Sequence, residues 1–286
     1  MFNRIKGVFS GSEKIEKKEE PPVELPEVRP FSDMEQESAP TTVHKPDHIK
    51  MDINHAGHMR IVARNDVEAA IVGAEALRVT REKKTISYGQ DMVSAYLSEF
   101  PFLKFMTITK NGDTLCTFPF FNLGTPFDGR ITDVTECQNG CEGQLEIYTK
   151  GSALTFFDAL YFKNKNTYFP GKDARILLSG IAYVLTKTRG VAAGDKKTST
   201  HELSYQELAF RYENGDLDDY VFRGKVLESR EFSVMGKKAQ AIKVPLRIGV
   251  DTVLDIYVCV TENAIKEKLQ KGDYVSGIVW LQGFIV

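Results

Sequence analysis

The sequence is poor in cysteine: only four occur among its 286 residues. So few thiols exclude the disulfide framework that stabilises many small secreted domains. Its apolar stretches are short and interrupted, which predicts no transmembrane helix. The N-terminal residues include no apolar run of the length that a secretory signal needs. We therefore expect a cytoplasmic protein with reduced thiols.

The chain also lacks a large net charge. Its 37 Lys and Arg residues nearly balance its 39 Asp and Glu residues, and the formal net charge is −2 at pH 7. This balance excludes a protein that holds nucleic acid through overall positive charge, but it leaves room for a local groove of lysine and arginine. Any contact with nucleic acid must come from where the cations lie.

No motif of a known catalytic class is present. The sequence contains no G-x-S-x-G elbow, no H-E-x-x-H helix and no phosphate-binding P-loop. We therefore predict a non-enzymatic binding protein and expect no cofactor.

Histidine is scarce, but it is concentrated in one segment. Of five histidines, four are His44, His48, His55 and His58. Neutral imidazole is a common zinc ligand, so this cluster is a candidate metal site. Its spacing matches no common zinc-finger pattern and no cysteine lies nearby. Clustered surface histidines that hold no specific metal are the alternative.

Residues 1–58 have the composition of a disordered tether. Glu, Lys, Pro and Ser dominate residues 10–50, and such a segment cannot bury enough apolar surface to order itself. Before it, residues 2–9 place apolar side chains at helical spacing: Phe2, Ile5, Val8 and Phe9. A short amphipathic helix there would dock on a protein or a membrane surface. A frayed terminus is the alternative.

Residues 59–126 predict a small α+β cap. Asn65 is a good N-cap with Glu68 three residues later, and the helix that follows carries one apolar stripe: Val67, Ala70, Ile71, Ala74 and Leu77. A second helix is predicted from Gln90 to Phe100. A hairpin follows, with strands at 103–110 and 114–120 and a turn at 111–113.

This stretch resembles half of a cystathionine-β-synthase-type (CBS) ligand-sensing module. The resemblance rests on LRV at 77–79, KTIS at 84–87 opening the second helix, FMTI at 105–108 and NGDTL at 111–115. It implies a small-molecule sensor. Family members that bind adenosine nucleotides hold the ribose with an Asp three residues after a Ser or Thr, whereas Phe120 occupies that position after Thr117.

The C-terminal part contains the same unit twice. FDGRI at 127–131 recurs as FRGKV at 222–226, and SGIAYV at 179–184 recurs as SGIVWL at 276–281. A duplicated unit with its own opening and closing signals predicts two small domains in tandem. We place them at 127–187 and 221–286, with an inter-repeat insertion at 188–220.

Each unit is predicted to contain three strands, a connection and closing strands. In the second unit the connection at 262–269 has the composition of a short helix. This order resembles the oligonucleotide/oligosaccharide-binding (OB) fold, so the predicted fold class is mainly β, with two tandem OB-like barrels and the α+β cap. The resemblance implies ligand binding on one open face, by aromatic stacking beside cations.

The alternation of side chains along the strands indicates which residues lie on the open face. If Leu154, Phe156, Leu254 and Ile256 point into the barrels, the outward aromatic side chains are Phe157, Tyr161 and Tyr257. Trp280 matches Tyr183 in the repeat and is added to them. The candidate phosphate contacts are Arg130, Lys150, Lys225 and Lys243. The alternative is that these aromatic residues pack between domains or against a partner protein.

Three functions therefore remain open. The leading prediction is a module that binds single-stranded DNA or RNA across paired barrel faces. A protein-interaction or assembly module is the second, and a small-molecule sensor through the CBS-like segment is the third. The ligand and the oligomeric state do not follow from the sequence.

Overall fold

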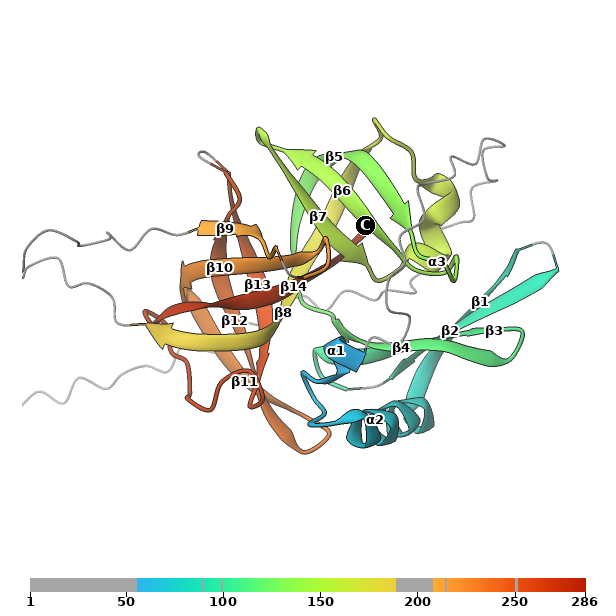
Figure 1. Cartoon of the computed structure of the whole chain (residues 1–286), viewed down its shortest axis with the longest axis horizontal. Helices are drawn as coiled ribbons and strands as arrows, with labels where there is room; N and C mark the ends of the chain where they lie inside the picture. Colours follow the sequence, from blue (N-terminus) through green and yellow to red (C-terminus); the bar gives the residue numbers. More distant parts are fainter. Residues whose placement is uncertain (1–55, 89, 99, 189–207, 214, 250–251) are drawn as a thin grey trace, which may run out of the picture.

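A computed structural model describes residues 56–88, 90–98, 100–188, 208–213, 215–249 and 252–286. The predicted helix at 2–9, residues 1–55 of the predicted tether, and His44, His48 and His55 lie outside these residues. The predicted tether ends too late in the chain, because its residues 56–58 belong to a helix. The described chain is mainly β, as predicted, and forms a four-stranded sheet and a ten-stranded sheet (Figure 1). No helix in these ranges is both long and apolar enough to cross a membrane.

The N-terminal sheet is an antiparallel meander with two helices beside it. Helix α1 (Ala56–Met59) precedes α2 (Asp66–Arg78), and the sheet has the order β1 (Thr80–Tyr88), β2 (Asp91–Ser98), β3 (Leu103–Lys110) and β4 (Asp113–Phe121). The predicted N-cap is confirmed, because the Asn65 side chain accepts from the Glu68 N–H at 2.9 Å. The predicted hairpin is confirmed too, with Asn111 and Gly112 both at positive φ in its turn.

The helix predicted from Gln90 to Phe100 is wrong, because these residues contain strand β2. It is a central strand that pairs with β1 on one side and β3 on the other. Val93, Ala95 and Leu97 are buried at every second position. Apolar residues at i and i+4 fit both the helical and the strand period. Pairing with β1 and β3 makes this segment a strand.

The ten-stranded sheet includes a closed barrel, here called the first barrel. Its strands are β5 (Thr125–Glu136), β6 (Gly143–Thr149), β7 (Ser152–Asp158), β8 (Asp173–Thr188) and β14 (Tyr274–Ile285). Each pairs with its neighbours, and the β8–β14 pairing closes the ring. Helix α3 (Tyr161–Asn164) and the 3₁₀ turn η1 (Lys165–Thr167) connect β7 to β8.

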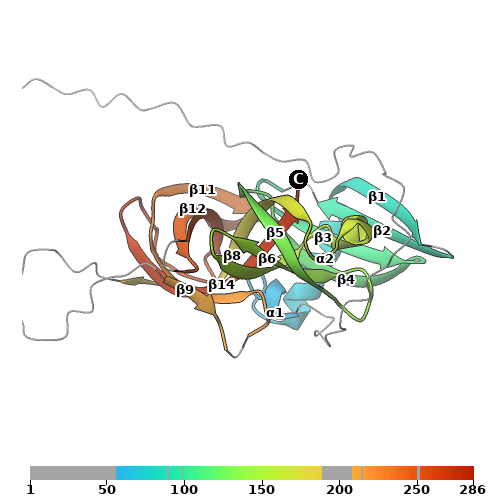
Figure 2. The ribbon, with the colours of Figure 1, turned by 90° about the horizontal axis from the view of Figure 1, so that it is seen from above.

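The other strands form a second lobe around the same two long strands. They are β9 (Leu208–Arg211), β10 (Asp219–Lys225), β11 (Glu228–Val234), β12 (Lys237–Arg247) and β13 (Val253–Thr261). Strand β13 pairs with the middle of β8, and β10 pairs with the N-terminal half of β14. In the view from above, the second lobe and the N-terminal sheet extend toward opposite ends of the molecule (Figure 2). They also meet directly, since Phe121 of β4 stacks on Phe232 of β11 with ring centroids 6.4 Å apart.

The two repeats exchange strands. Strand β14 belongs to the second repeat, yet its end pairs in parallel with β7 of the first, at Gln282↔Phe157 and Gly283↔Asp158. Strand β8 belongs to the first repeat, yet Ser179–Ile181 pair in parallel with Tyr257–Cys259 of the second. Neither repeat completes its strand ring alone, so the two are joined rather than merely adjacent.

The repeated glycines explain why this exchange is possible. Gly180 lies opposite Leu281 and Gly277 opposite Leu185 in the β8–β14 ladder. A Cβ at Gly180 would lie 2.5 Å from Val279 Cγ2, and one at Gly277 would lie 2.0 Å from the Val184 carbonyl oxygen. The SGI motif therefore recurs because glycine alone permits the close approach of the two shared strands.

The helix predicted at 262–269 is also wrong. This segment contains turns and bends, and tertiary hydrogen bonds hold both of its ends. The Asn263 side chain donates to the Arg60 carbonyl at 3.0 Å, and the Leu269 N–H donates to the Gln240 side chain at 3.0 Å. These bonds replace the intrahelical ones that the composition favours.

Candidate functional site

Phe157 points out of the first barrel, as alternation predicts, but it is fully buried. Its neighbour Phe156 fills the barrel interior, while Phe157 packs against the N-terminal sheet. The rings of Phe118 and Phe157 meet edge to face, with centroids 4.9 Å apart. The prediction that Phe157 lies on an open binding face is wrong, because the N-terminal sheet covers that face.

Tyr161 and Trp280 are buried as well, so neither is available to stack on a ligand. Tyr161 begins α3, packs in the core of the first barrel and donates to the Glu136 carboxylate at 3.2 Å. Trp280 is fully buried at the junction of the barrel strands, where its indole N–H donates to Asp218 at 3.0 Å. For both residues the alternative of packing between elements is the one that the structure shows.

Tyr257 is half-buried on the second lobe, beside one of the predicted cations. It lies directly across the β12–β13 ladder from Lys243, whose Nζ is 5.8 Å from the ring centroid. The tyrosine hydroxyl donates to Glu228 at 3.0 Å, and Lys243 Nζ lies 3.5 Å from the same carboxylate. The acidic partner offsets the positive charge here.

Lys225 has a similar neighbour. It lies across the β10–β14 ladder from Tyr274, with Nζ 5.6 Å from the ring centroid. Cross-strand placement brings both Lys225 and Lys243 to the face of a tyrosine, an arrangement that favours cation–π contact.

The remaining predicted cations, Arg130 and Lys150, lie together in an open hollow on the first barrel. The hollow has a volume of about 700 Å³ and is formed by β5, the end of β6, the β6–β7 turn and the start of β8. Its aromatic residue is Tyr148, whose side chain is 50% exposed. Arg175 supplies a third cation, and Asp128 and Asp173 supply two carboxylates.

Local structure explains how these side chains meet. Ile147 is buried inside the barrel, so alternation turns Tyr148 outward. Strand register places Tyr148 opposite Arg130, and Arg130 in turn opposite Asp173. Lys150 stands in the tight β6–β7 turn, where Lys150 and Gly151 both have positive φ.

The charges of the hollow are partly paired. Arg130 donates to both carboxylate oxygens of Asp173, from Nε at 2.8 Å and from Nη2 at 3.3 Å. This pair lowers the pKa of Asp173 from its ordinary value. Both side chains stay exposed, at 59% and 75%. The hollow thus presents an exposed aromatic ring among three cations and two carboxylates, a set that suits a base stacked on the ring with a phosphate beside it.

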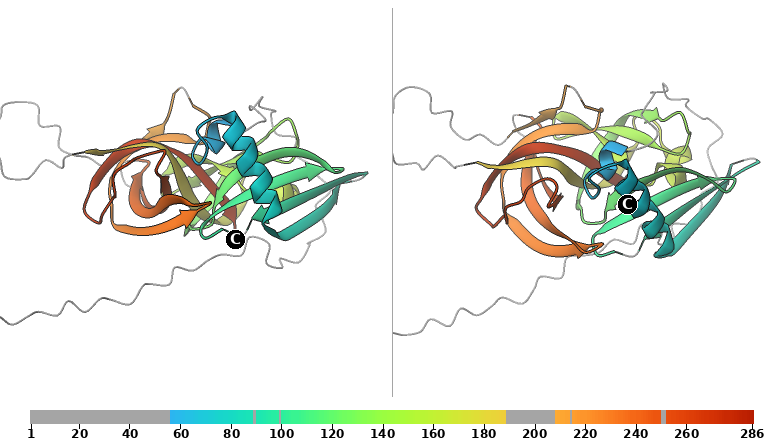
Figure 3. Two further views of the ribbon diagram at one scale, coloured as in Figure 1. Left: turned by 90° about the horizontal axis from the view of Figure 1, so that it is seen from below. Right: turned by 60° about the horizontal axis from the view of Figure 1, so that its bottom comes forward.

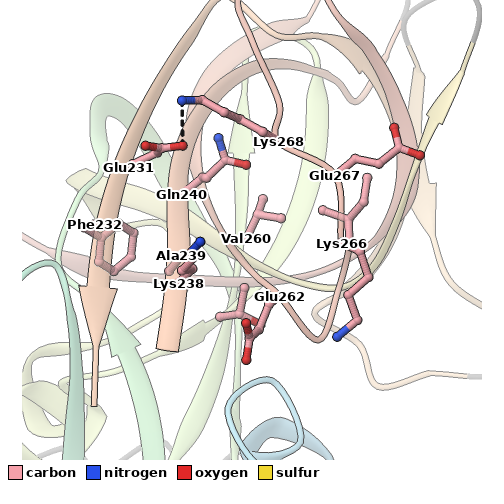
Figure 4. A pocket seen from close by; sticks show the side chains of 12 residues that line it. Glu231, Phe232, Lys238, Ala239, Gln240, Val260, Glu262, Lys266, Glu267 and Lys268 are labelled. Carbon is pink, nitrogen blue, oxygen red and sulfur yellow. Dashed lines mark ion pairs between the residues drawn. The ribbon is translucent and has the colours of Figure 1, made fainter. Parts of the chain in front are cut away.

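A second depression, here called the end cleft, lies at one end of the second lobe (Figure 4). It has a volume of about 570 Å³ and lies between β11 and the segment that follows β13. Phe232, Ala239, Val260 and Ile265 give it apolar walls, and Lys268 pairs with Glu231 at 2.8 Å. Its charged residues balance: Lys238, Lys266 and Lys268 against Glu231, Glu262 and Glu267.

The end cleft exists because the two repeats differ in one connection. In the first barrel the connection between the third and fourth strands forms α3 and η1, and Tyr161 and Tyr168 pack from it into the core. In the second lobe the corresponding segment has no helix. The amide of Gln240 holds it by pairing with both the N–H and the carbonyl of Leu269.

The chain places three aspartates close together at 216–219, and two of them are buried. Asp218 is fully buried and Asp219 nearly so. Burial raises the pKa of Asp218 to about 7 and that of Asp219 to about 6. A third buried carboxyl, Asp158, accepts from the Tyr168 hydroxyl at 2.5 Å, and burial raises its pKa to about 7.

Of the four clustered histidines, the described residues include His58. It lies in α1 and is 7% exposed, and its ring stacks on Trp280 with centroids 3.8 Å apart. Within the described ranges, no group of three or more His, Cys, Asp or Glu residues is arranged to hold a metal ion. His58 thus packs on the shared strand β14.

No protein-family model matches the chain, and no curated protein is significantly similar to it in sequence. A functional assignment therefore depends on the residues themselves.

Sequence reasoning found two cations of the hollow and missed its aromatic residue. The signal for Tyr148 was present, since it alternates with the apolar Leu145 and Ile147 along one strand. Arg175 was missed because only register places it beside Asp128 across the β5–β8 ladder.

Proposed function

We propose that the protein is a non-enzymatic cytoplasmic module that binds single-stranded nucleic acid, built on two OB-like barrels that share β8 and β14. The first barrel supports the resemblance, since β5, β6 and β7 are followed by a short helix, β8 and a fifth strand. The second lobe repeats this order without the helix. OB folds bind oligonucleotides on the face of their second and third strands and the adjoining loops.

The observation that carries this proposal is the exposed ring of Tyr148 among Arg130, Lys150 and Arg175. Tyr148 lies on β6, the second strand of the first barrel, and Lys150 lies in the turn between the second and third strands. A base stacked on Tyr148 would bring its phosphates within reach of the three cations. Binding of this kind tolerates many sequences, because every base offers a flat face.

The charge balance sets the strength and the salt dependence of binding. Three phosphate contacts on a single strand give a slope of roughly −2 in a plot of log affinity against log salt. Affinity should then fall roughly twentyfold between 50 and 200 mM salt. We expect micromolar binding rather than the tighter binding of strongly basic proteins.

Fluorescence anisotropy of the full chain with labelled single-stranded DNA, single-stranded RNA and duplex tests the proposal. Single strands should bind in preference to duplex, and Tyr148→Ala should weaken binding roughly tenfold, the usual loss for one stacked base. Phe169→Ala is the matched control, because Phe169 is equally exposed but does not line the hollow. Absence of binding at low salt, or equal loss in both variants, would overturn the proposal.

A protein-interaction module is the second candidate, and α2 favours it. This helix exposes an apolar stripe that includes Val67 and Ile71. The sensor function implied by the CBS-like segment has no comparable support, since the helix on which that resemblance partly rests is strand β2.

A further inference from the structure

The exposed stripe of α2 is the most apolar helix surface among the described residues. Val67 is 72% exposed, Ile71 63% and Leu77 38%. Ala70 and Ala74 are also exposed and complete the stripe. The opposite face of α2, with Val72 and Ala76, packs on the N-terminal sheet. Seen from below, α2 lies in front of that sheet (Figure 3, left). An exposed stripe of this kind marks an interaction surface.

The stripe is self-complementary when the helix is reversed. An antiparallel partner centred on residue 72 places Val67 opposite Leu77, Ala70 opposite Ala74, and Ile71 close to its own copy. Large side chains then meet at the ends and centre of the contact, and small ones between them let the backbones approach. An isologous two-fold contact requires this kind of symmetry.

The charges at the ends of α2 agree with this arrangement. Asp66 begins the helix and Arg78 ends it. Within the chain they pair with Arg60 at 3.8 Å and Glu75 at 2.5 Å, and their side chains remain 78% and 71% exposed. Reversal brings Asp66 of each copy to Arg78 of the other. A parallel arrangement would instead place like charges together, and it would align the two helix dipoles unfavourably.

We infer that α2 is the contact surface of a homodimer, in which the stripe packs antiparallel against α2 of a second copy of this chain. The inference does not depend on nucleic-acid binding. A helix of 13 residues is about 20 Å long. One such pair buries an area at the low end of specific interfaces, so the dimer should form in the micromolar range.

Analytical ultracentrifugation of the full chain over about 1–200 μM tests the oligomeric state. A reversible monomer–dimer equilibrium is expected, and Ile71→Glu should raise the dimer dissociation constant at least tenfold because it places two carboxylates at the centre of the contact. Val184→Glu is the matched control, since Val184 is also apolar and 47% exposed but lies on β8. It should leave the dissociation constant unchanged.

Cysteine cross-linking tests the orientation. All four native cysteines are buried, so an introduced thiol reacts alone. Ile71→Cys should form a disulfide dimer, whereas Val67→Cys should not pair with itself, because its two copies would lie about 15 Å apart along the helix axis. A mixture of Val67→Cys and Leu77→Cys chains should cross-link.

The inference fails if the wild-type chain stays monomeric at the highest concentration. It also fails if Val67→Cys pairs with itself as readily as Ile71→Cys does. A dimer that Ile71→Glu leaves intact would place the interface elsewhere. If Ile71→Glu loses its cooperative thermal transition, Ile71→Ser is tested in its place. The same rise in the dimer dissociation constant is expected for it.

Discussion

The indole N–H of Trp280 donates to a buried carboxylate oxygen of Asp218 at 3.0 Å. The backbone repeats the link, since the Leu281 N–H donates to the Asp218 carbonyl at 2.9 Å. The ring of His58 stacks on Trp280. The residue before β10, strand β14 and helix α1 thus meet at one indole ring, which joins the N-terminal part to the shared strands.

This contact predicts an unusual dependence of stability on pH. Burial is the main cause that raises the pKa of Asp218 to about 7, and the neighbouring charge of Asp219 adds to it. An unfolded Asp ionises near its ordinary value of 3.8, so between these two values the folded state holds a proton that the unfolded state releases. The contribution of Asp218 to the free energy of unfolding is therefore largest below pH 4, and it falls as the pH rises to 7.

Asp218→Asn tests the prediction. The amide oxygen still accepts from Trp280, but the cost of ionising a buried carboxyl disappears. The pKa of Asp218 is raised from 3.8 to about 7, which is roughly three units. Each unit corresponds to about 1.4 kcal/mol, so the variant should be more stable at pH 8 by on the order of 4 kcal/mol. Thermal unfolding from pH 4.5 to 8.5 should show a flatter profile than the wild type. Asp133→Asn, on an exposed part of β5, is the control and should keep the wild-type slope.

A methyl group at Gly277 should destabilise the protein. Its Cβ would meet two backbone atoms of β8, the Val184 carbonyl oxygen at 2.0 Å and Leu185 Cα at 3.0 Å. Backbone atoms in a hydrogen-bonded ladder cannot easily move away from the added methyl group. Gly277→Ala should therefore lower the free energy of unfolding, measured by urea titration, by about 3 kcal/mol.

Gly73→Ala is the matched control, and its effect on the free energy of unfolding should have the opposite sign. Gly73 lies inside α2, where the atom nearest to an added Cβ is 3.9 Å away. Replacement by alanine should stabilise the protein by about 0.5–1 kcal/mol. Equal effects of the two substitutions would contradict the close approach of β8 and β14.

Removal of the last five residues should open the first barrel. Residues 282–286 include the part of β14 that pairs with β7, and the Gln282 side chain is fully buried. It accepts from the Phe121 N–H at 3.1 Å and donates to the Pro119 carbonyl at 2.7 Å. A chain that ends at Leu281 should therefore lose hydrogen-exchange protection in β7, which is far away in sequence.

Deletion of Val286 alone is the control for this truncation, since its side chain is 41% exposed and it follows the last residue of β14. It should preserve protection of β7. Unchanged exchange of β7 in the longer truncation would show that the first repeat closes without β14.

The thiols should be unreactive in the folded protein. Cys116, Cys137, Cys141 and Cys259 are all buried, and burial raises the pKa of each thiol. The thiolate is the reactive form, so a thiol reagent such as DTNB should titrate none of the four rapidly at pH 7.5. All four should react in denaturant. Rapid native reaction of Cys137 or Cys141 would show that the turn between them opens.

Local patterns predicted the start of α2 and the β3–β4 hairpin correctly, because both depend on neighbours in sequence. Asn65 and Glu68 predicted a helix start, and Asn111-Gly112 a tight hairpin. The repeated glycines predicted equivalent positions in two units, and both lie in the ladder between β8 and β14. The predicted helices at 90–100 and 262–269 were wrong, since paired strands in one case and tertiary hydrogen bonds in the other outweighed helical composition.

The site was predictable only in part. Arg130 and Lys150 were predicted as phosphate contacts and both line the hollow, but Phe157 and Trp280 were assigned to an open face and are buried. Alternation gives the side of a strand on which a residue lies and says nothing about what covers that side. The N-terminal sheet covers Phe157, and α1 and Asp218 enclose Trp280.

The sequence by itself determined that this chain is mainly β and duplicated, because alternation and turn residues act over a few positions and the repeats can be read directly. Tertiary structure alone decided that each repeat lends a strand to the other, because pairing between Gln282 and Phe157 leaves no trace in local propensity. It also decided which aromatic rings face solvent. Exposure is a property of the assembled layers, and it left Tyr148 and the stripe of α2 among the exposed apolar side chains.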